Sequence, residues 1–226
     1  KMMILNFPHN PTAMTLDDIG YYETVVDMAK RLNIAVISDF AYGDTCFDGY
    51  KAPSFLSVKG AKDVGVEFST MSKAFNMAGW RIGFAAGNKH MIDALATIKG
   101  YYDYGIFQAV QIASIIALRH CEQERDEQNK KYAMRRDVVC ECLNKLGWKH
   151  QVPRATMFVW ARVADEHLKG RSTIDFSMDL IEHANVVVSP GRAFGDHGEG
   201  YVRIALVENE NRIRQAFRNI KKYVIK

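Results

Sequence analysis

A single lysine and an arginine eight positions later form the most chemically suggestive pattern in this sequence. Lys73 and Arg81 lie in the stretch Phe68–Phe84, together with the hydroxyl groups of Thr70 and Ser72. An amine nucleophile of this kind forms Schiff bases with carbonyl compounds, pyridoxal phosphate included. Hydroxyl groups beside an arginine fork suit a phosphate group. A lone lysine beyond a strand is more often a solvated surface residue, so the pattern needs support from the rest of the chain.

Short apolar strands are expected to position these side chains. Residues Val64–Ser69 have the pattern of a buried strand that ends just before the lysine. Residues 1–6 and Ile34–Ser38 are two further apolar runs, of the kind that parallel sheets bury on both faces. Between them, Thr15–Leu32 has a capping-box-like start and apolar residues at helical spacing. This order predicts a right-handed strand-helix-strand unit in an α/β fold with a mostly parallel sheet and helices on both faces.

Polar side chains follow these strands. Asp39 comes directly after Ile34–Ser38, and Asn10 projects from a turn that two prolines keep extended. Open α/β sheets bind ligands at the carboxyl ends of their strands, so we expect Asn10, Asp39 and Lys73 at one edge of the sheet. Each residue alone also fits a simpler explanation, since Asn-Pro steps make turns and aspartates cap helices.

The second half of the chain has a different organisation. Opposite charges at helical spacing fill Glu122–Arg136, which predicts a solvated helical face that links two domains. We therefore expect residues 1–120 to be the C-terminal part of a large domain, and residues 121–226 to be a linking helix with a small α+β domain. In that domain we expect strands at 156–163, 186–189 and 201–206, and helices at 173–183 and 209–224.

Composition excludes several classes of function. The 226 residues are 48% hydrophobic and 25% charged, which is ordinary for a globular protein, and the net charge of +4 is too small and too dispersed to favour a nucleic-acid partner. No apolar run has the length of a membrane span. Four cysteines without a Cys-x-x-Cys pair indicate reduced thiols in a cytoplasmic protein. No metal site is expected, because no zinc-like ligand spacing occurs, and no nucleophile elbow of a hydrolase is present.

Four segments, in order along the chain, resemble the motifs of class I/II (fold-type I) aminotransferases. STMSKAFNMAGWRIG resembles the Schiff-base lysine signature of that family, with Gly-x-Arg-x-Gly after the lysine. NFPHNPTA around Asn10, SDFAYGD around Asp39 and Tyr42, and GEGYVRIAL around Arg203 are similar to the other three motifs. The residues of these motifs are most similar to those of the branch of the family that includes alanine, aspartate and LL-diaminopimelate aminotransferases.

The resemblance implies pyridoxal 5'-phosphate as cofactor and gives a role to each motif residue. Lys73 would form the Schiff base and then act as the base that moves the substrate α-proton. Asp39 would pair with the pyridine nitrogen, while Tyr42 and Asn10 would hydrogen-bond the phenolic O3′.

The remaining motif residues would bind charged groups of the cofactor and the substrate. Thr70, Ser72 and Arg81 would bind the cofactor phosphate. Arg203 would bind the substrate α-carboxylate with its planar fork, and Asn10 would be a second substrate-binding residue. Ala13 stands where the family usually has glycine.

These roles imply amino-group transfer between an amino acid and a 2-oxo acid, by a protein that is a homodimer in its full-length form. Members of the family carry a long N-terminal half before the point where this sequence starts, so we expect a fragment that is inactive by itself. Two alternatives stay open. One is a carbon–sulfur lyase of the same fold, and the other is a catalytically inactive remnant with an interaction role.

Overall fold

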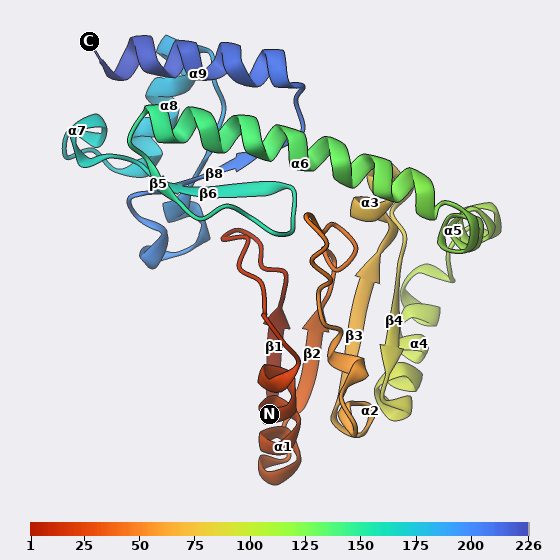
Figure 1. Ribbon diagram of the computed structural model, residues 1–226. Coiled ribbons are helices and arrows are strands. Elements are labelled where there is room, and N and C mark those ends of the chain that lie inside the picture. Colours follow the sequence, from red (N-terminus) through yellow and green to blue (C-terminus); the bar gives the residue numbers. More distant parts are fainter. Residues whose placement is uncertain (226) are drawn as a thin grey trace. The chain divides into compact units, whose positions relative to one another are not determined.

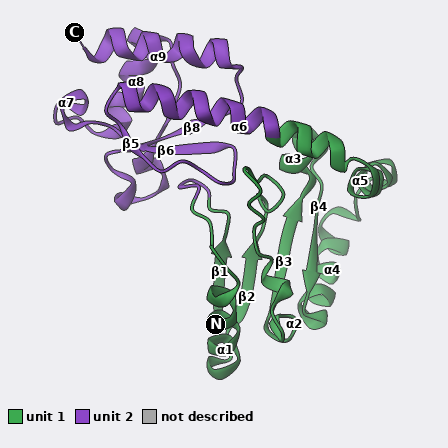
Figure 2. Cartoon of the chain, in the orientation of Figure 1, with its two compact units in different colours: residues 1–9, 14–129 green, residues 10–13, 130–226 purple. Residues whose placement is uncertain are grey.

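The computed structural model describes residues 1–225, which divide into two compact units. Residues 1–9 and 14–129 form the first unit, and residues 10–13 join residues 130 onward in the second (Figure 2). The chain passes from the first unit to the second within one long helix, α6 (Glu122–Lys145).

A four-stranded sheet forms the centre of the first unit (Figure 1). Its strands are β1 (Met2–Asn6), β2 (Ala35–Asp39), β3 (Gly65–Thr70) and β4 (Gly83–Gly87), in the order β1-β2-β3-β4. The first three strands are parallel, as predicted, and β4 is antiparallel to β3. In this register Asn6 lies opposite Asp39, and Asp39 lies opposite Phe68.

Helix α1 (Gly20–Leu32) connects β1 to β2 and packs on the sheet. The buried side chains of this core are Leu5, Tyr22, Val25, Val26, Ala29, Val36, Phe55, Val58 and Ala61. The predicted helix start at Thr15 is wrong. The helix begins at Gly20, and its N-cap residue is Ile19, which makes no side-chain capping bond. In the turn just before the helix, Oδ1 of Asp18 accepts from the N–H of Gly20 at 2.7 Å.

Short helices and turns join β2, β3 and β4. The connection from β2 to β3 contains η1 (Phe55–Ser57) and α2 (Ala61–Val64). The connection from β3 to β4, residues 71–82, carries Lys73 and is called the lysine loop below; it contains α3 (Met71–Ala74) and η2 (Ala78–Trp80). A second core cluster consists of three residues of that loop and one residue of α5, namely Met71, Met77, Ile82 and Ala117.

Helices α4 (Lys89–Asp103) and α5 (Gln108–His120) follow β4. Asn88 caps α4, since its side chain accepts from the N–H of Met91 at 3.2 Å. Helix α4 continues through Gly100 up to Asp103, and the left-handed φ of 56° at Tyr104 ends it.

An antiparallel sheet forms the second unit. Its strands are β5 (Lys149–His150), β6 (Phe158–Arg162), β8 (Tyr201–Ala205) and β7 (Ser189–Pro190), in that order across the sheet. The helices are α7 (Asp165–Leu168), α8 (Thr173–Ala184) and α9 (Glu210–Val224), and the turns η3 (Gly191–Phe194) and η4 (Asp196–Gly198) precede β8. The strand that was expected at 186–189 is instead the short β7, because only Ser189 and Pro190 pair with β8.

No helix in the described part of the chain has the length and apolar character needed to cross a membrane. The four cysteines are all free thiols.

Candidate active site

The lysine loop begins with a hydrogen-bonded turn. Thr70 is the last residue of β3 and caps α3, because its Oγ1 accepts from the N–H of Ser72 at 3.1 Å. The same Oγ1 lies 3.0 Å from Oγ of Ser72 and 3.2 Å from the carbonyl oxygen of Ile82. Lys73 is the next residue on this short helix and is half-buried. The structure therefore brings the two predicted phosphate-binding hydroxyls together beside the lysine.

Tyr42 and Lys73 approach each other from different loops. Nζ of Lys73 lies 5.7 Å from the centroid of the Tyr42 ring, within the range of a cation–π contact. The Tyr42 side chain is buried. The structure thus brings the lysine amine close to the ring of Tyr42.

Asp39 is fixed at the carboxyl end of β2. Its Oδ1 accepts from the N–H of Ala41 at 3.2 Å, and its carbonyl oxygen accepts from Nδ2 of Asn6 at 3.0 Å. Because β2 and β3 are parallel neighbours, Asp39 and the loop that carries Lys73 leave the sheet at the same edge.

A buried carboxylate that sequence reasoning missed connects three segments beneath this edge. Oε2 of Glu67 accepts from Oγ of Ser38 at 3.1 Å and from the N–H of Phe55 at 2.8 Å, and Oε1 accepts from Oγ of Ser54 at 2.6 Å. Glu67 is 8% exposed. Ser38 directly precedes Asp39, so this network holds the end of β2 that carries Asp39. A glutamate within an apolar run was the only signal of it in the sequence.

Arg81 follows the Gly-Trp pair in a left-handed conformation, with φ of 53°. Its side chain is exposed, and Nη1 donates to the carbonyl oxygen of Ala78 at 3.0 Å. Gly83, two residues on, lets β4 approach β3 closely, since a Cβ there would stand 2.6 Å from the carbonyl oxygen of Ser69. The guanidinium of Arg81 thus contacts the backbone of the loop that also carries the two hydroxyls.

Arg203 and Asn10 meet in the second unit. Nη1 of Arg203, on β8, donates to Oδ1 of Asn10 at 2.6 Å, and Nη2 donates to Oγ of Ser189 at 3.2 Å. An arginine only donates hydrogen bonds, so the Asn10 atom that faces it is the oxygen, and the amide NH₂ points elsewhere. Nearby, Ala13 has a left-handed φ of 57°, a conformation in which glycine carries no steric cost.

Two aromatic rings that the sequence did not single out lie over the Arg203 guanidinium. Cζ of Arg203 is 4.1 Å from the ring centroid of Phe158 and 4.7 Å from that of Phe194. Phe158 is on β6, and Phe194 ends the turn η3.

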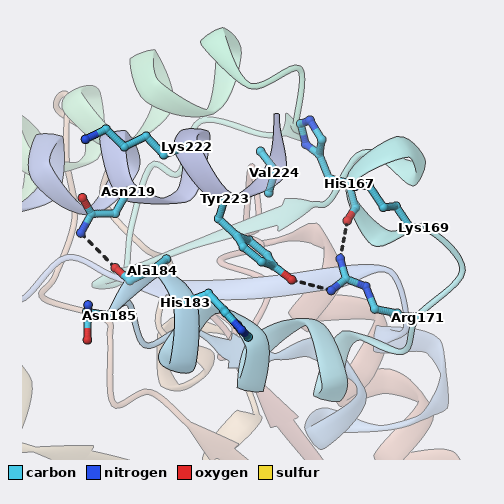
Figure 3. A pocket seen from close by; sticks show the side chains of 10 residues that line it. All are labelled: His167, Lys169, Arg171, His183, Ala184, Asn185, Asn219, Lys222, Tyr223 and Val224. Atoms are coloured by element: carbon cyan, nitrogen blue, oxygen red, sulfur yellow. Dashed lines mark hydrogen bonds between the residues drawn. The ribbon is translucent and has the colours of Figure 1, made fainter. Parts of the chain in front are cut away.

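A cavity of about 690 Å³ lies elsewhere in the second unit (Figure 3). Arg171 is part of its lining, but its donors already contact the Tyr223 hydroxyl, the Asp179 carboxylate and the carbonyl oxygens of His167 and Leu168. None of the predicted site residues is among the residues that line it.

The chain matches the family described as aminotransferase class I and II over residues 1–220, and it belongs to this family. Glutamate-pyruvate aminotransferase AlaC of Escherichia coli (strain K12) is 48% identical over 221 residues, which are 98% of this chain and 53% of AlaC. LL-diaminopimelate aminotransferase of Moorella thermoacetica is 41% identical over 98% of this chain and 56% of that protein.

Solved structures also match this chain over almost its whole length. Apo BacF from Bacillus subtilis matches with a TM-score of 0.91 and 38% identity, over 98% of this chain and 58% of that chain. A probable N-succinyldiaminopimelate aminotransferase from Thermus thermophilus matches with a TM-score of 0.91 and 33% identity, over 99% of this chain and 58% of that chain. The predicted family and its fold-type I α/β architecture are confirmed, and the chain spans about half the length of the curated relatives it matches.

Proposed function

We propose that this chain supplies the Schiff-base lysine and the substrate-carboxylate arginine of a pyridoxal-phosphate-dependent aminotransferase. The observation that carries the proposal is the placement of Lys73 on an ordered turn beside Tyr42, at the sheet edge where Asp39 ends β2. Family membership and relatives named as aminotransferases support the same reaction for the whole protein, which would exchange an amino group between an amino acid and a 2-oxo acid.

The side chains of the first unit fit the cofactor by their chemistry. Lys73 offers an amine for its aldehyde carbon, Asp39 a carboxylate for its ring nitrogen, and Tyr42 a phenol for O3′. Thr70 and Ser72, with Arg81 on the same loop, offer hydroxyls and a cation for its phosphate. When bound, pyridoxal phosphate supplies an electron sink for the carbanion at the substrate α-carbon.

Each residue would then have one task. The Asp39 carboxylate would keep a proton on the ring nitrogen, since an adjacent negative charge favours the charged form of that nitrogen. Nζ of Lys73 would take the α-proton from the amino acid and pass it to the aldehyde carbon of the cofactor, and in the reverse half-reaction it would move a proton in the opposite direction. Arg203 would bind the α-carboxylate and so orient the α-carbon.

The full-length protein would act as a homodimer in the cytoplasm. Four free cysteines support a reducing compartment. The names of the relatives point to alanine, glutamate or LL-diaminopimelate as amino donors.

An isotope-exchange assay tests the proposal. The full-length protein with pyridoxal phosphate, ¹⁵N-alanine and 2-oxoglutarate is expected to form ¹⁵N-glutamate. Lys73→Ala should abolish the exchange, whereas Lys62→Ala, an exposed lysine on α2, should not change it. Release of pyruvate and a thiol from cystathionine, without any amino-group exchange, would instead identify a carbon–sulfur lyase.

A further inference from the structure

The guanidinium of Arg203 is covered by aromatic rings from two different segments. The Phe158 ring, on the neighbouring strand β6, is 4.1 Å from Cζ, and the Phe194 ring is 4.7 Å from it. Phe158 is a buried core residue, at 7% exposure, whereas Phe194 is 41% exposed. Burial of apolar surface therefore explains the position of Phe158 much better than that of Phe194.

The loop before β8 holds Phe194 in place through its glycines. A Cβ on Gly191 would stand 2.1 Å from the carbonyl oxygen of Gly198, so the two ends of the loop pack backbone to backbone. Gly195, directly after Phe194, has φ of 123°, which side chains rarely allow. The loop conformation thus requires glycine at these positions.

Side-chain contacts complete the placement. The Phe194 ring meets Trp160 edge-on, with centroids 6.0 Å apart, and Trp160 stacks on Tyr201 at 5.4 Å. Nη2 of Arg192 is 3.1 Å from the Asp196 carboxylate, across the turn that carries Phe194. Phe194 therefore contacts both Trp160 and the guanidinium of Arg203, although it remains exposed to solvent.

Rings over a guanidinium have two effects on what it binds. The negative face of each ring attracts the cation. The rings also restrict how the group can turn, while its N–H donors point outward in its own plane. A carboxylate is a planar acceptor that meets such donors with both oxygens.

We propose that Phe194 is a positioning residue that fixes the plane of the Arg203 guanidinium and so makes this side chain selective for a substrate carboxylate. The inference deepens the proposed function, on which it rests for the identity of the ligand. Phe194 would not touch the reacting atoms and would act only through Arg203.

A comparison of ligands that differ only in the carboxylate tests the proposal. In the full-length protein, the equilibrium binding of propionate and of propionamide is measured by NMR titration for the wild type, Phe194→Leu and Phe194→Tyr. Leucine keeps an apolar side chain but has no ring, and tyrosine keeps the ring. Phe194→Leu is expected to weaken propionate binding roughly 2- to 30-fold, the range of a cation–π contact converted at 1.36 kcal/mol per tenfold.

Propionamide binding should stay unchanged in Phe194→Leu, and Phe194→Tyr should bind propionate like the wild type. Equal losses for propionate and propionamide would overturn the proposal, because Phe194 would then serve loop packing alone. Unchanged propionate binding in Phe194→Leu would overturn it as well. The assay needs no turnover, so a wild-type protein that shows the expected pattern but exchanges no amino groups would support the role of Phe194 and refute the proposed reaction.

Discussion

Nη1 of Arg203 donates a hydrogen bond of 2.6 Å to Oδ1 of Asn10, although 193 positions separate the two residues. The contact joins the proline turn near the start of the chain to strand β8 near its end. It also orients the asparagine, because the oxygen faces the arginine and the NH₂ group is left to donate elsewhere. One residue of the proposed cofactor site is thus oriented by the proposed substrate-binding residue.

A negative charge at position 10 is expected to weaken the binding of the substrate carboxylate by Arg203. Asn10→Asp would place a carboxylate against the guanidinium, and this internal ion pair would compete with the substrate carboxylate. We expect KM for the amino acid to rise at least about tenfold, which corresponds to about 1.4 kcal/mol. Steady-state kinetics of the full-length protein give the answer. Asn10→Ser serves as the neutral control, and an equal rise of KM in both variants would contradict the electrostatic explanation.

Lys73 is expected to be the lysine that carries the cofactor. Borohydride reduction of the full-length protein with pyridoxal phosphate should fix the label on Nζ of Lys73, because this amine lies on an ordered turn beside Tyr42. Peptide mapping by mass spectrometry locates the label. Label on another lysine, such as the exposed Lys62, would refute the assignment.

The variant Asp39→Asn measures how much the proposed ion pair between the Asp39 carboxylate and the pyridine nitrogen contributes to the rate of turnover. Removing one member of a buried, hydrogen-bonded ion pair costs about 3–5 kcal/mol, which amounts to roughly two to four decades in rate if it is lost in the transition state. The amide keeps the size of the side chain, and its Oδ1 can still accept from the N–H of Ala41. Turnover within a few-fold of the wild type would exclude the role.

Features that depend on local sequence could be predicted. Ile34–Ser38 and Val64–Ser69 are continuous apolar runs, and the structure places β2 and β3 within one residue of them. The position of Asp39 at a strand end followed directly from this. The start of α1 differs from the expected one because Thr15 and Asp18 are both of the residue types that cap helices, whereas the cap position in the folded chain is Ile19.

Features that depend on long-range packing could not be predicted. Nothing in the spacing of the glycine-rich loop shows that Phe194 lies over Arg203, since that contact needs both the turn η3 and the pairing of β6 with β8. Glu67 was missed for the same reason, because its three donors come from segments 12 to 29 residues away along the chain.

Substitution of Glu67 tests whether its network stabilises the sheet edge. Glu67→Leu would leave the hydroxyls of Ser38 and Ser54 and the N–H of Phe55 without their acceptor, at about 1–3 kcal/mol for each buried group. We expect the free energy of unfolding to fall by at least about 3 kcal/mol. Glu67→Gln can still accept from Ser38 and Phe55 through its amide oxygen, and its NH₂ group can donate to Oγ of Ser54, so this variant should lose much less. Urea unfolding compares the variants, and similar losses in both would show that the charge of Glu67 matters more than its hydrogen bonds.

The buried pair of Trp148 and His167 is expected to make the stability of the second unit depend on pH. Nε1 of Trp148 donates to Nδ1 of His167 at 2.8 Å, so Nδ1 must carry no proton. Burial lowers the pKa of His167 below its ordinary value of 6.5, although Glu166, 4.0 Å from its Nε2, opposes this shift. The folded state thus prefers the neutral ring, and the unfolded state binds more protons as the pH falls. The contribution of His167 to stability is therefore complete above pH 6.5 and declines at lower pH.

A matched variant separates His167 from the other groups that titrate in this range. His9, in the first unit, also has a pKa lowered by burial, so the wild type alone does not identify the residue. His167→Gln can still accept from Trp148 through Oε1 but does not titrate between pH 5 and 8. Urea midpoints, followed by tryptophan fluorescence at pH 7.5 and 5.5, should fall more in the wild type than in His167→Gln. Equal falls in the two proteins would place the pH dependence outside the Trp148–His167 contact.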